Sequence, residues 1–424
     1  MENVYPVTTL SNGLQVVTHR LPGRDSLAVG IWMNVGSRHE TPAISGISHF
    51  IEHLVFKGTK KRSAKDIKLD IEGRGGILNA FTSEDTTCFF VKMAKEHLTL
   101  AVDVLSDMVF TPRLDAKEIE RERTVILEEI KMYHDMPMHY AHDLVNQLVW
   151  PNQPLGMFIA GTLDSVSGIT RKNVVDYHNQ FYAPNNACIS VCGDIAHADV
   201  VREVQRMVTM KTKKKAFGHE PAHARQSKPR FHMYEKDTAQ AHMVIAMHGL
   251  KREHKDRQAL GLLHMIMGAN MSSRLYEEVR EKRGLAYEIR SGVHYYADVG
   301  SFVISAGIEN GKEEQTAIII RKELEKVIRR GVTVRELAHA KEYLLNHFYF
   351  GLEDTMDHML WMGEKALHTG DVPTREGIKE RVERVTREDI QRVAASIFKT
   401  KKMSVVVIGN MDKKRQAKIK EVFA

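Results

Sequence analysis

The chain has 424 residues, 43% of them apolar and 27% charged, which is the composition of a globular protein with more than one domain. No apolar run approaches the roughly 20 residues that a membrane-spanning helix needs, and the first residues lack the basic and apolar segments of a secretory signal. The net charge of +7 comes partly from lysine-rich runs at 211–215 and 399–402. Because neither run accompanies a recognition element, we expect no nucleic acid and no membrane among the partners.

The cysteine content points to a reducing compartment. Three cysteines, Cys88, Cys188 and Cys192, are too few for a disulfide framework. Cys188 and Cys192 lie in an apolar, strand-like run, so we expect buried and reduced thiols. Reduced thiols and the absence of a recognisable leader together predict a cytoplasmic location.

Apolar periodicity predicts a mixture of strands and helices along the whole chain. In chain order these are a strand at 27–35, helices at 45–57 and 64–73, a strand at 86–93, helices at 95–109 and 115–135, strands at 186–193 and 242–248, a helix at 256–268, a strand at 301–307, helices at 313–329, 333–351 and 387–397, and a strand at 403–408. Grouped strands with grouped helices indicate an α+β protein rather than a doubly wound parallel sheet.

Two pairs of similar segments indicate an internal duplication. An alternating apolar run that ends at Gly36 has a counterpart that ends at Gly249, and the run around Gly193 has one around Gly409. Each pair is separated by roughly 200 residues, so the sequence predicts two homologous domains. We expect domains at 1–210 and 232–424, joined by a linker at 211–231 that is rich in Lys, His, Gln and Pro.

The most informative stretch is His-Phe-Ile-Glu-His at residues 49–53. On a helix, His49 and His53 are one turn apart and project from the same face, with Glu52 beside them. Two imidazoles at this spacing can bind one zinc ion, and the adjacent carboxylate can take a proton from a zinc-activated water. The order reverses the His-Glu-x-x-His motif of zinc peptidases. The alternative is a pair of surface histidines beside a solvated glutamate.

A catalytic zinc site needs a third protein ligand. Within the predicted helix 115–135, Glu122 and Glu129 are two turns apart and share a face, whereas Glu128 points elsewhere. One of the two could bind metal and the other could hold a ligand or the base in place. The alternative is a solvated acidic stripe.

These residues belong to a longer resemblance. The run Gly-Ile-Ser-His-Phe-Ile-Glu-His-Leu-Val-Phe-Lys-Gly-Thr at 46–59 resembles the signature of the pitrilysin and mitochondrial-processing-peptidase family of zinc peptidases. In that family the third ligand is a glutamate 76 residues beyond the second histidine, which is Glu129 here, and another acidic residue lies seven positions earlier, which is Glu122. The resemblance implies one Zn²⁺ per chain, held by His49, His53 and Glu129. It implies that Glu52 is the general base and Glu122 an auxiliary catalytic carboxylate.

Further matches extend along most of the chain. The segment 75–82 resembles the family's edge strand, which implies substrate backbone contact by residues Asn79, Ala80, Phe81 and Thr82. Read alone, this segment is a glycine-rich turn that leads into a strand. In the second half, Arg280 and Tyr287 match a substrate-holding pair seven residues apart, which implies that both contact substrate and that Tyr287 stabilises the oxyanion. Their alternative is an exposed arginine and a half-buried tyrosine. One departure is Gln-Pro-Leu-Gly-Met at 153–157, where the family often has His-Pro-Leu-Gly-Arg.

The expected function is therefore that of a zinc metalloendopeptidase acting on short or unfolded peptides, with presequence or peptide processing as its expected role. The resemblance implies an extended peptide inside a chamber closed by two pairs of domains. One chain supplies one pair, so we expect a homodimer, with a heterodimer containing a metal-free relative as the alternative. A second reading is a catalytically silent subunit of the same fold that serves assembly or scaffolding. The intact metal set favours the enzyme, since silent subunits typically lose a ligand or the base.

Overall fold

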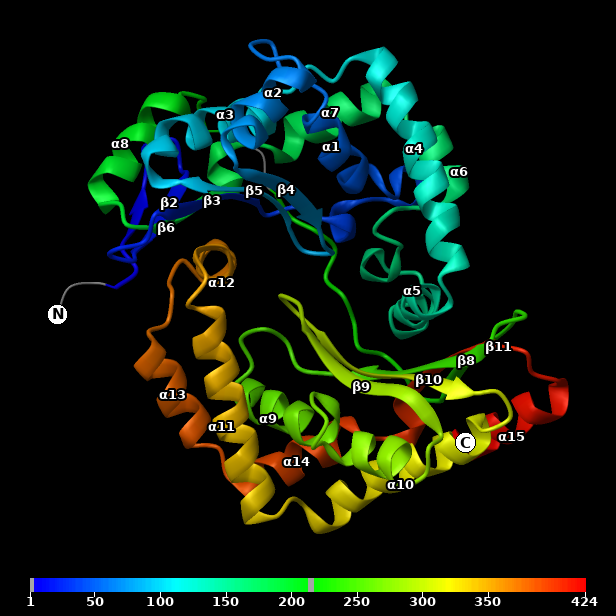
Figure 1. Ribbon diagram of the computed structural model, residues 1–424. Coiled ribbons are helices and arrows are strands. Elements are labelled where there is room, and N and C mark those ends of the chain that lie inside the picture. Colours follow the sequence, from blue (N-terminus) through cyan, green and yellow to red (C-terminus); the bar gives the residue numbers. More distant parts are fainter. Residues whose placement is uncertain (1–3, 213–216) are drawn as a thin grey trace. The chain divides into compact units, whose positions relative to one another are not determined.

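The computed structural model describes residues 4–212 and 217–424. Contacts between Cα atoms divide the chain into two compact units, and each unit is discontinuous in the sequence. Unit 1 contains Met1–Ile130, Met157–Glu220 and Phe348–Arg375, and unit 2 contains Lys131–Gly156, Pro221–His347 and Glu376–Ala424. Each unit is built on one β-sheet (Figure 1).

The sheet of unit 1 has six strands in the order β1-β2-β6-β3-β5-β4. Their bounds are β1 Val7–Thr9, β2 Gln15–Arg20, β3 Ser26–Met33, β4 Ile77–Thr82, β5 Thr87–Ala94 and β6 Ala187–Gly193. All neighbours are antiparallel except β2 and β6, which are parallel. Strand β4 pairs only with β5 and therefore forms one edge of this sheet.

The sheet of unit 2 has five strands in the order β7-β11-β8-β10-β9. Their bounds are β7 Arg230–Glu235, β8 Gln240–His248, β9 Ala286–Tyr295, β10 Gly300–Glu309 and β11 Met403–Gly409. Only β7 and β11 are parallel. The order and directions repeat those of β2-β6-β3-β5-β4, so β3 corresponds to β8 and β6 to β11. These are the segments in which the sequence predicts the duplication.

Helices form a layer on one face of each sheet. The helices that belong mainly to unit 1 are α1 Ile47–Val55, α2 Ala64–Ile71, α3 Leu98–Phe110, α4 Ala116–Asp135, α6 Leu163–Gly168, α7 Arg171–Phe181, α8 His197–Met207 and α12 Thr355–Thr369. Those mainly of unit 2 are α5 Pro137–Val149, α9 Arg257–Gly268, α10 Glu313–Arg330, α11 Val334–Gly351, α13 Arg375–Glu383, α14 Arg387–Ile397 and α15 Lys413–Phe423. A short π-helix, η7, covers Tyr276–Glu281. Short 3₁₀ helices are η1 Ser37–His39, η2 Pro42–Ile44, η3 Glu72–Arg74, η4 Lys95–His97, η5 Pro154–Gly156, η6 Pro184–Asn186 and η8 Thr400–Lys402.

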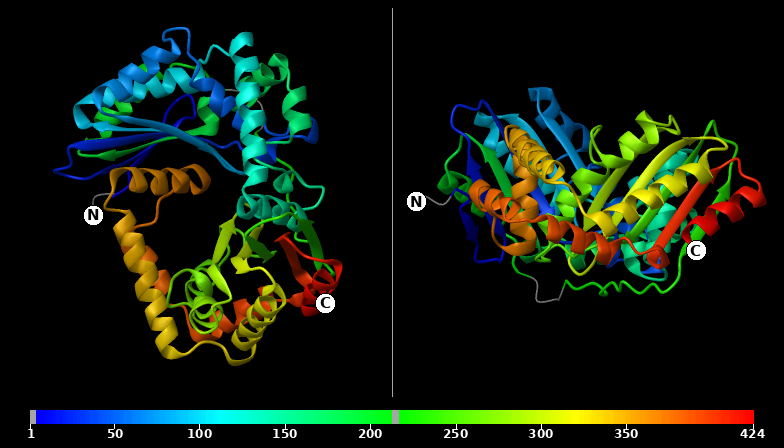
Figure 2. Two further views of the ribbon diagram at one scale, coloured as in Figure 1. Left: turned by 45° about the vertical axis from the view of Figure 1, so that its right-hand side comes forward. Right: turned by 90° about the horizontal axis from the view of Figure 1, so that it is seen from below.

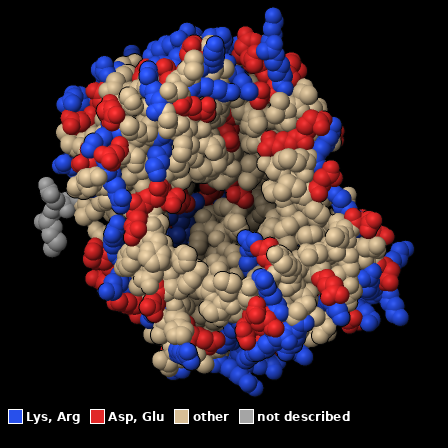
Figure 3. All heavy atoms as spheres, in the orientation of Figure 1, with Lys and Arg blue, Asp and Glu red and all other residues tan. Residues whose placement is uncertain are grey.

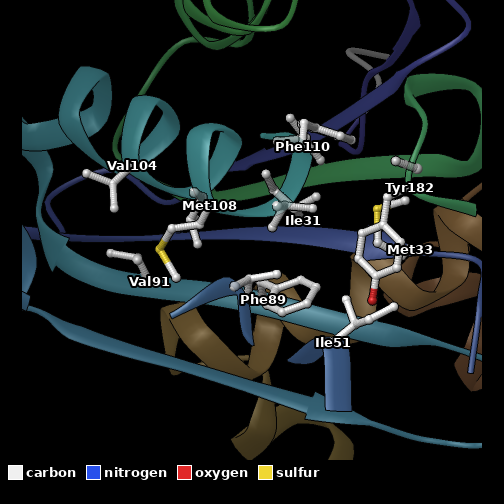
Figure 4. Packing of buried hydrophobic residues seen from close by; sticks show 14 of the residues in the cluster. Ile31, Met33, Ile51, Phe89, Val91, Val104, Met108, Phe110 and Tyr182 are labelled. Atoms are coloured by element: carbon white, nitrogen blue, oxygen red, sulfur yellow. The ribbon is translucent and has the colours of Figure 1, made fainter. Parts of the chain in front are cut away.

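The main core of unit 1 lies between its sheet and this helical layer. Because side chains alternate along a strand, Ile31 and Met33 of β3 and Phe89 of β5 point to the same side. There they meet Ile51 of α1 and Met108 of α3 (Figure 4). All five side chains are fully buried. Burial of this size fixes α1 against the sheet, and α1 carries the histidine motif.

The opposite face of each sheet is covered by a helix that comes from the other half of the sequence. Helix α12, from the second half, packs on β3, β6 and β2 of unit 1 (Figures 1 and 2). Helix α5, from the first half, packs on β8, β11 and β7 of unit 2. We propose that the repeat divides the chain into domains at 1–210 and 232–424, joined by a linker at 211–231. The compact units differ from this division, because each unit includes one of these two helices from the other half of the sequence.

Helix α12 approaches its sheet closely because of a glycine. A Cβ atom on Gly363 would lie 2.1 Å from Trp32 Nε1 and 2.5 Å from Ser190 Oγ, and these two atoms share a buried hydrogen bond of 3.1 Å. We therefore expect Gly363→Ala to lower the free energy of unfolding by about 1–3 kcal/mol, measured by urea denaturation. Gly351→Ala is the matched control, since a Cβ there would meet no atom within 4 Å beyond its neighbours in its own helix. Equal stability of the two variants would contradict this packing.

The predicted fold class is confirmed: the chain is α+β, with two related and mostly antiparallel sheets. All six strands and all eight helices predicted from periodicity are present, within a few residues of the expected bounds. The expected linker overlaps the start of β7 at Arg230, and residues 213–216 of it lie outside the described residues. Cys188 and Cys192 are free and buried, as expected, and Cys88 is free and buried as well.

Two surface properties bear on the expected partners. Among the described residues, no helix combines the length and the apolar character that a bilayer crossing requires. On the face shown in Figure 3, Lys and Arg side chains are interspersed with Asp and Glu side chains over most of the area. The positive net charge is therefore not gathered into one continuous basic field on this face.

Candidate metal centre

Helix α1 is fixed at its N-terminus by a buried carboxylate. Its N-cap, Gly46, has φ 93°, and a Cβ there would lie 2.6 Å from the Ala160 carbonyl oxygen, so this position requires glycine. The Glu40 carboxylate accepts N–H groups from Gly46 at 2.7 Å and from Ser48 at 2.8 Å. Burial raises the pKa of Glu40 to about 8, and these two donors act in the opposite direction. Glu40 thus satisfies N–H groups at the helix start that have no partner within the helix.

The two histidines of α1 lie on its partly accessible side. Ile47, Phe50, Ile51 and Leu54 point into the core, while the side chains of His49 and His53 keep 12% and 23% of their surface exposed. Their ring centroids are 4.7 Å apart. This is the same-face arrangement that the i, i+4 spacing predicts.

Glu129 of α4 completes a three-residue group with these histidines. Glu129 Oε2 lies 3.8 Å from His49 Nε2 and 3.5 Å from His53 Nε2. One ligand atom from each of the three residues lies within 4.8 Å of the other two, and no other such group of three occurs among the described residues. Glu129 is partly buried, whereas Glu128 is exposed, which agrees with the expected difference between these neighbours.

The chemistry of this group fits zinc. Two imidazole nitrogens and one carboxylate oxygen form the protein ligand set of several catalytic zinc sites, which leave the fourth position for water or substrate. Burial lowers the pKa of His49 to about 4, and His53 acts in the same direction, so His49 is neutral as a ligand requires. Burial also disfavours charge on His53, but hydrogen bonds to Glu122 and Glu129 outweigh it and raise the pKa of His53 to about 9.

A second carboxylate holds His53 from the other side. His53 Nδ1 donates to Glu122 Oε2 at 3.2 Å, and Lys57 Nζ lies 2.6 Å from Glu122 Oε1. Burial acts to raise the pKa of Glu122, but its hydrogen bonds with His53 and Lys57 hold the pKa below its usual range. By contrast, Nδ1 of His49 is buried and makes no hydrogen bond with any described residue.

Glu52 is held by the edge strand of the sheet. Thr82 Oγ1, at the end of β4, donates a hydrogen bond to Glu52 Oε2. Burial raises the pKa of Glu52, and the Thr82 hydroxyl acts in the opposite direction. A partly desolvated carboxylate beside a possible metal position has the character of a general base. The sequence assigns Thr82 to substrate backbone contact and gives no sign of this bond to Glu52.

The remaining residues of β4 lie along the open edge of the sheet. The N–H of Ala80 donates to the Asn79 side chain at 2.8 Å rather than to β5, so it points away from the sheet. Since backbone groups alternate along an antiparallel strand, Leu78 and Thr82 also direct theirs to this edge. The Phe81 ring packs against Trp32 and Phe90 on the α12 side of the sheet.

The expected pair Arg280 and Tyr287 lies in unit 2. Arg280 belongs to η7, and its guanidinium carbon lies 4.8 Å from the Tyr276 ring centroid and 5.3 Å from that of Tyr287. Tyr287, at the start of β9, is 74% exposed. Arg280 is therefore held between two aromatic rings, and its partner Tyr287 is available to solvent.

Comparison with known families gives two consecutive matches. Residues 15–163 match the insulinase family, peptidase family M16, and residues 168–344 match the inactive domain of peptidase family M16. The three-residue metal group and Glu52 lie within the first match. The second match covers much of the second half, for which the sequence predicts no metal ligand.

Individual relatives match over nearly the full length. An uncharacterized zinc protease of Streptomyces coelicolor is 36% identical over 98% of this chain and 92% of its own length. An uncharacterized zinc protease of Bacillus subtilis is 36% identical over 92% of this chain and 95% of its own. A protease from Helicobacter pylori has a similar structure, with a TM-score of 0.91, 27% identity and coverage of 96% of this chain and 99% of that chain.

The duplicated α+β fold, with two histidines and a glutamate gathered beside an edge strand, defines a zinc-protease-like protein built from two related units. The family matches and the full-length relatives make the assignment specific. The chain belongs to the insulinase family, peptidase family M16.

Proposed function

We propose that this protein is a zinc metallopeptidase that hydrolyses peptide bonds in short or unfolded peptides. The observation that supports this most directly is the convergence of His49, His53 and Glu129, whose ligand atoms lie within 4.8 Å of one another. In the proposal these three residues hold one zinc ion per chain, and Glu52 is the general base. Relatives named as zinc proteases at 36% identity support the same chemistry.

When bound, zinc supplies Lewis-acid polarisation of the scissile carbonyl and lowers the pKa of water to about 7. The Glu52 carboxylate takes the proton of the attacking water as the new C–O bond forms, and gives a proton to the leaving nitrogen as the C–N bond breaks. Thr82 Oγ1 holds one oxygen of this carboxylate by a hydrogen bond, so the base has a defined orientation. Glu122 fixes the orientation of the His53 ring by accepting a hydrogen bond from Nδ1.

The proposed substrate lies extended along β4. An exposed strand edge binds an extended peptide by main-chain hydrogen bonds, which suits an unfolded substrate. We assign Asn79, Ala80, Phe81 and Thr82 to this contact. Following the family resemblance, we further propose that Arg280 and Tyr287 contact substrate and that Tyr287 stabilises the oxyanion. The Tyr287 side chain is exposed, as a substrate contact requires.

The assembly is also part of the proposal. We propose a homodimer in which two chains enclose the substrate, with a heterodimer that includes a metal-free relative as the alternative. The proposed location is the cytoplasm, and the proposed role is peptide degradation or presequence processing. Light scattering at assay concentration tests the dimer, and a monomeric active protein contradicts it.

The test of the proposed function combines metal content with cleavage. Purified protein is stripped with a chelator, reloaded with zinc and assayed on a mixed library of quenched peptides. The proposal requires about one zinc per chain and cleavage that disappears on stripping and returns with zinc. A protein that binds zinc but cleaves nothing in the library contradicts the proposal and favours the alternative, a catalytically silent subunit that serves assembly or scaffolding.

Replacing Ala80 with Pro tests the edge-strand contact. Proline removes the Ala80 N–H, which faces the open edge, and leaves the pairing of β4 with β5 intact. We expect kcat/KM to fall roughly tenfold, since a lost hydrogen bond costs about 1 kcal/mol or more when the substrate carbonyl stays unpaired. Ala80→Ser keeps the N–H and is the control. Unchanged kcat/KM in a well-folded Ala80→Pro protein would rule out pairing at this residue.

A further inference from the structure

Lys57 of unit 1 has no part in the proposed chemistry, but it contacts Glu122, the carboxylate that holds His53. Lys57 lies one helical turn beyond His53 in sequence, just after α1, and its Nζ is 2.6 Å from Glu122 Oε1. The other oxygen of the same carboxylate, Oε2, accepts from His53 Nδ1 at 3.2 Å. A single carboxylate of α4 thus bridges His53 of α1 and Lys57 in the turn that follows α1.

Burial makes this bridge different from an ordinary surface ion pair. The Glu122 side chain is 7% exposed, and the Lys57 side chain is 33% exposed. A buried carboxylate needs a cation or hydrogen-bond donors, because transfer of a bare charge out of water is costly. His53 supplies one donor, and in a metal complex that histidine is neutral. Lys57 then provides the positive charge beside the carboxylate.

The hydrogen bond to Glu122 also determines which nitrogen of His53 can bind a metal ion. A carboxylate without a proton can only accept, so the hydrogen bond to Glu122 places the ring proton on Nδ1 and leaves the lone pair on Nε2. That Nε2 faces Glu129 Oε2 at 3.5 Å. His49 has no equivalent support, since its Nδ1 has no hydrogen-bond partner among the described residues. Of the two histidines in the metal group, only His53 therefore has its ring orientation fixed by a hydrogen bond from Nδ1 to a described residue.

We propose that Lys57 is a positioning residue that holds Glu122 against His53 Nδ1 and thereby sets the zinc affinity of the site. The inference rests on the proposed function in so far as zinc is the metal bound. Lys57 touches neither metal nor substrate, and its effect passes entirely through Glu122. Loss of partners that orient a metal ligand in this way typically weakens metal binding by about 10- to 100-fold.

The test is a double-variant cycle on zinc affinity, measured by competition with a chromophoric chelator and without peptide. We expect Lys57→Met to raise the zinc Kd about tenfold and Glu122→Gln to raise it by a similar or larger factor. Because Lys57 acts through Glu122, the double variant is expected to match Glu122→Gln alone. Effects that multiply in the double variant, or a wild-type Kd for Lys57→Met, would overturn the inference.

Two further variants separate this role from general stability. Lys61→Met is the matched control, since the Lys61 side chain is 65% exposed and its Nζ lies 3.4 Å from Asp103 Oδ1. It is expected to leave the zinc Kd unchanged. Lys57→Arg keeps a cation that can reach Glu122, so we expect its zinc Kd to stay within about threefold of wild type. If Lys57→Met does not fold, Lys57→Arg decides: a loss as large as that of Glu122→Gln overturns the inference.

This experiment distinguishes two failures. A wild-type protein that binds zinc but cleaves no peptide contradicts the peptidase proposal, while the cycle on zinc affinity still decides the role of Lys57. A wild-type protein that binds no zinc contradicts both.

Discussion

Replacing Glu52 with Gln is expected to lower kcat by roughly 10²- to 10⁴-fold, the usual contribution of a positioned general base. Glutamine has nearly the same shape and can still accept the hydrogen bond from Thr82 Oγ1. It cannot take the proton of the attacking water, so the loss is in the chemical step. We expect KM to change little, because Glu52 is not assigned to substrate binding. The measurement is steady-state kinetics on a quenched peptide.

Zinc content distinguishes this effect from a damaged site. Glu52 is not among the three residues of the metal group, so the Glu52→Gln protein is expected to keep about one zinc per chain. Glu96→Gln, at an exposed position of the same unit, is the control and should retain wild-type kcat. A Glu52→Gln protein with full zinc and wild-type kcat would remove Glu52 from the mechanism.

The second large effect is expected from Glu129→Gln, which replaces the carboxylate of the metal group by a neutral amide. Amide oxygens are much poorer zinc ligands than carboxylates, and the site loses its one negative ligand. We expect the zinc Kd to rise by at least about 100-fold, more than the loss of an orienting partner causes. Peptidase activity should disappear at limiting zinc. Chelator competition and cleavage assays on the same preparations measure both.

The chain contains a closely matched control for this variant. Glu128 precedes Glu129 on the same helix but is exposed, since one residue along a helix rotates the side chain by about 100°. Glu128→Gln makes the same chemical change and the same change in net charge, and it should leave the zinc Kd and kcat at wild-type values. Equal losses in both variants would mean that the charge of α4, rather than a ligand bond, controls metal binding.

Secondary structure was predictable where burial leaves a continuous apolar run in the sequence. Strands β3, β6 and β11 are buried along almost their whole length, so their continuous apolar runs stand out in the sequence. Edge strands such as β9 mix buried, partly buried and exposed residues without a regular alternation and carry charged ones, so periodicity alone does not reveal them. The positions of helices α5 and α12 were not predicted either. Each helix packs on a sheet formed mainly by the other half of the sequence, and this pairing depends on contacts between distant segments.

The candidate site divides in the same way. His49, Glu52 and His53 lie within one turn of one helix, so local spacing determines their common face whatever the rest of the chain does. Family resemblance supplied Glu129 by counting along the sequence, and the structure brings it within 3.5 Å of His53 Nε2. Spacing could not supply the bond from Thr82 to Glu52 or the bridge from Lys57 through Glu122. These contacts join elements that only tertiary packing brings together.

The sequence by itself thus determined the duplicated α+β organisation and the local face that carries the metal motif, because both follow from short-range periodicity and from repeated segments. Tertiary structure alone decided which sheet α5 and α12 cover and which partners hold Glu52 and His53. The physical reason is that hydrogen bonds and burial between distant segments depend on the packing of whole elements, whose approach is set by details such as Gly363 against Trp32. The local residue pattern does not predict how closely α12 packs on this sheet.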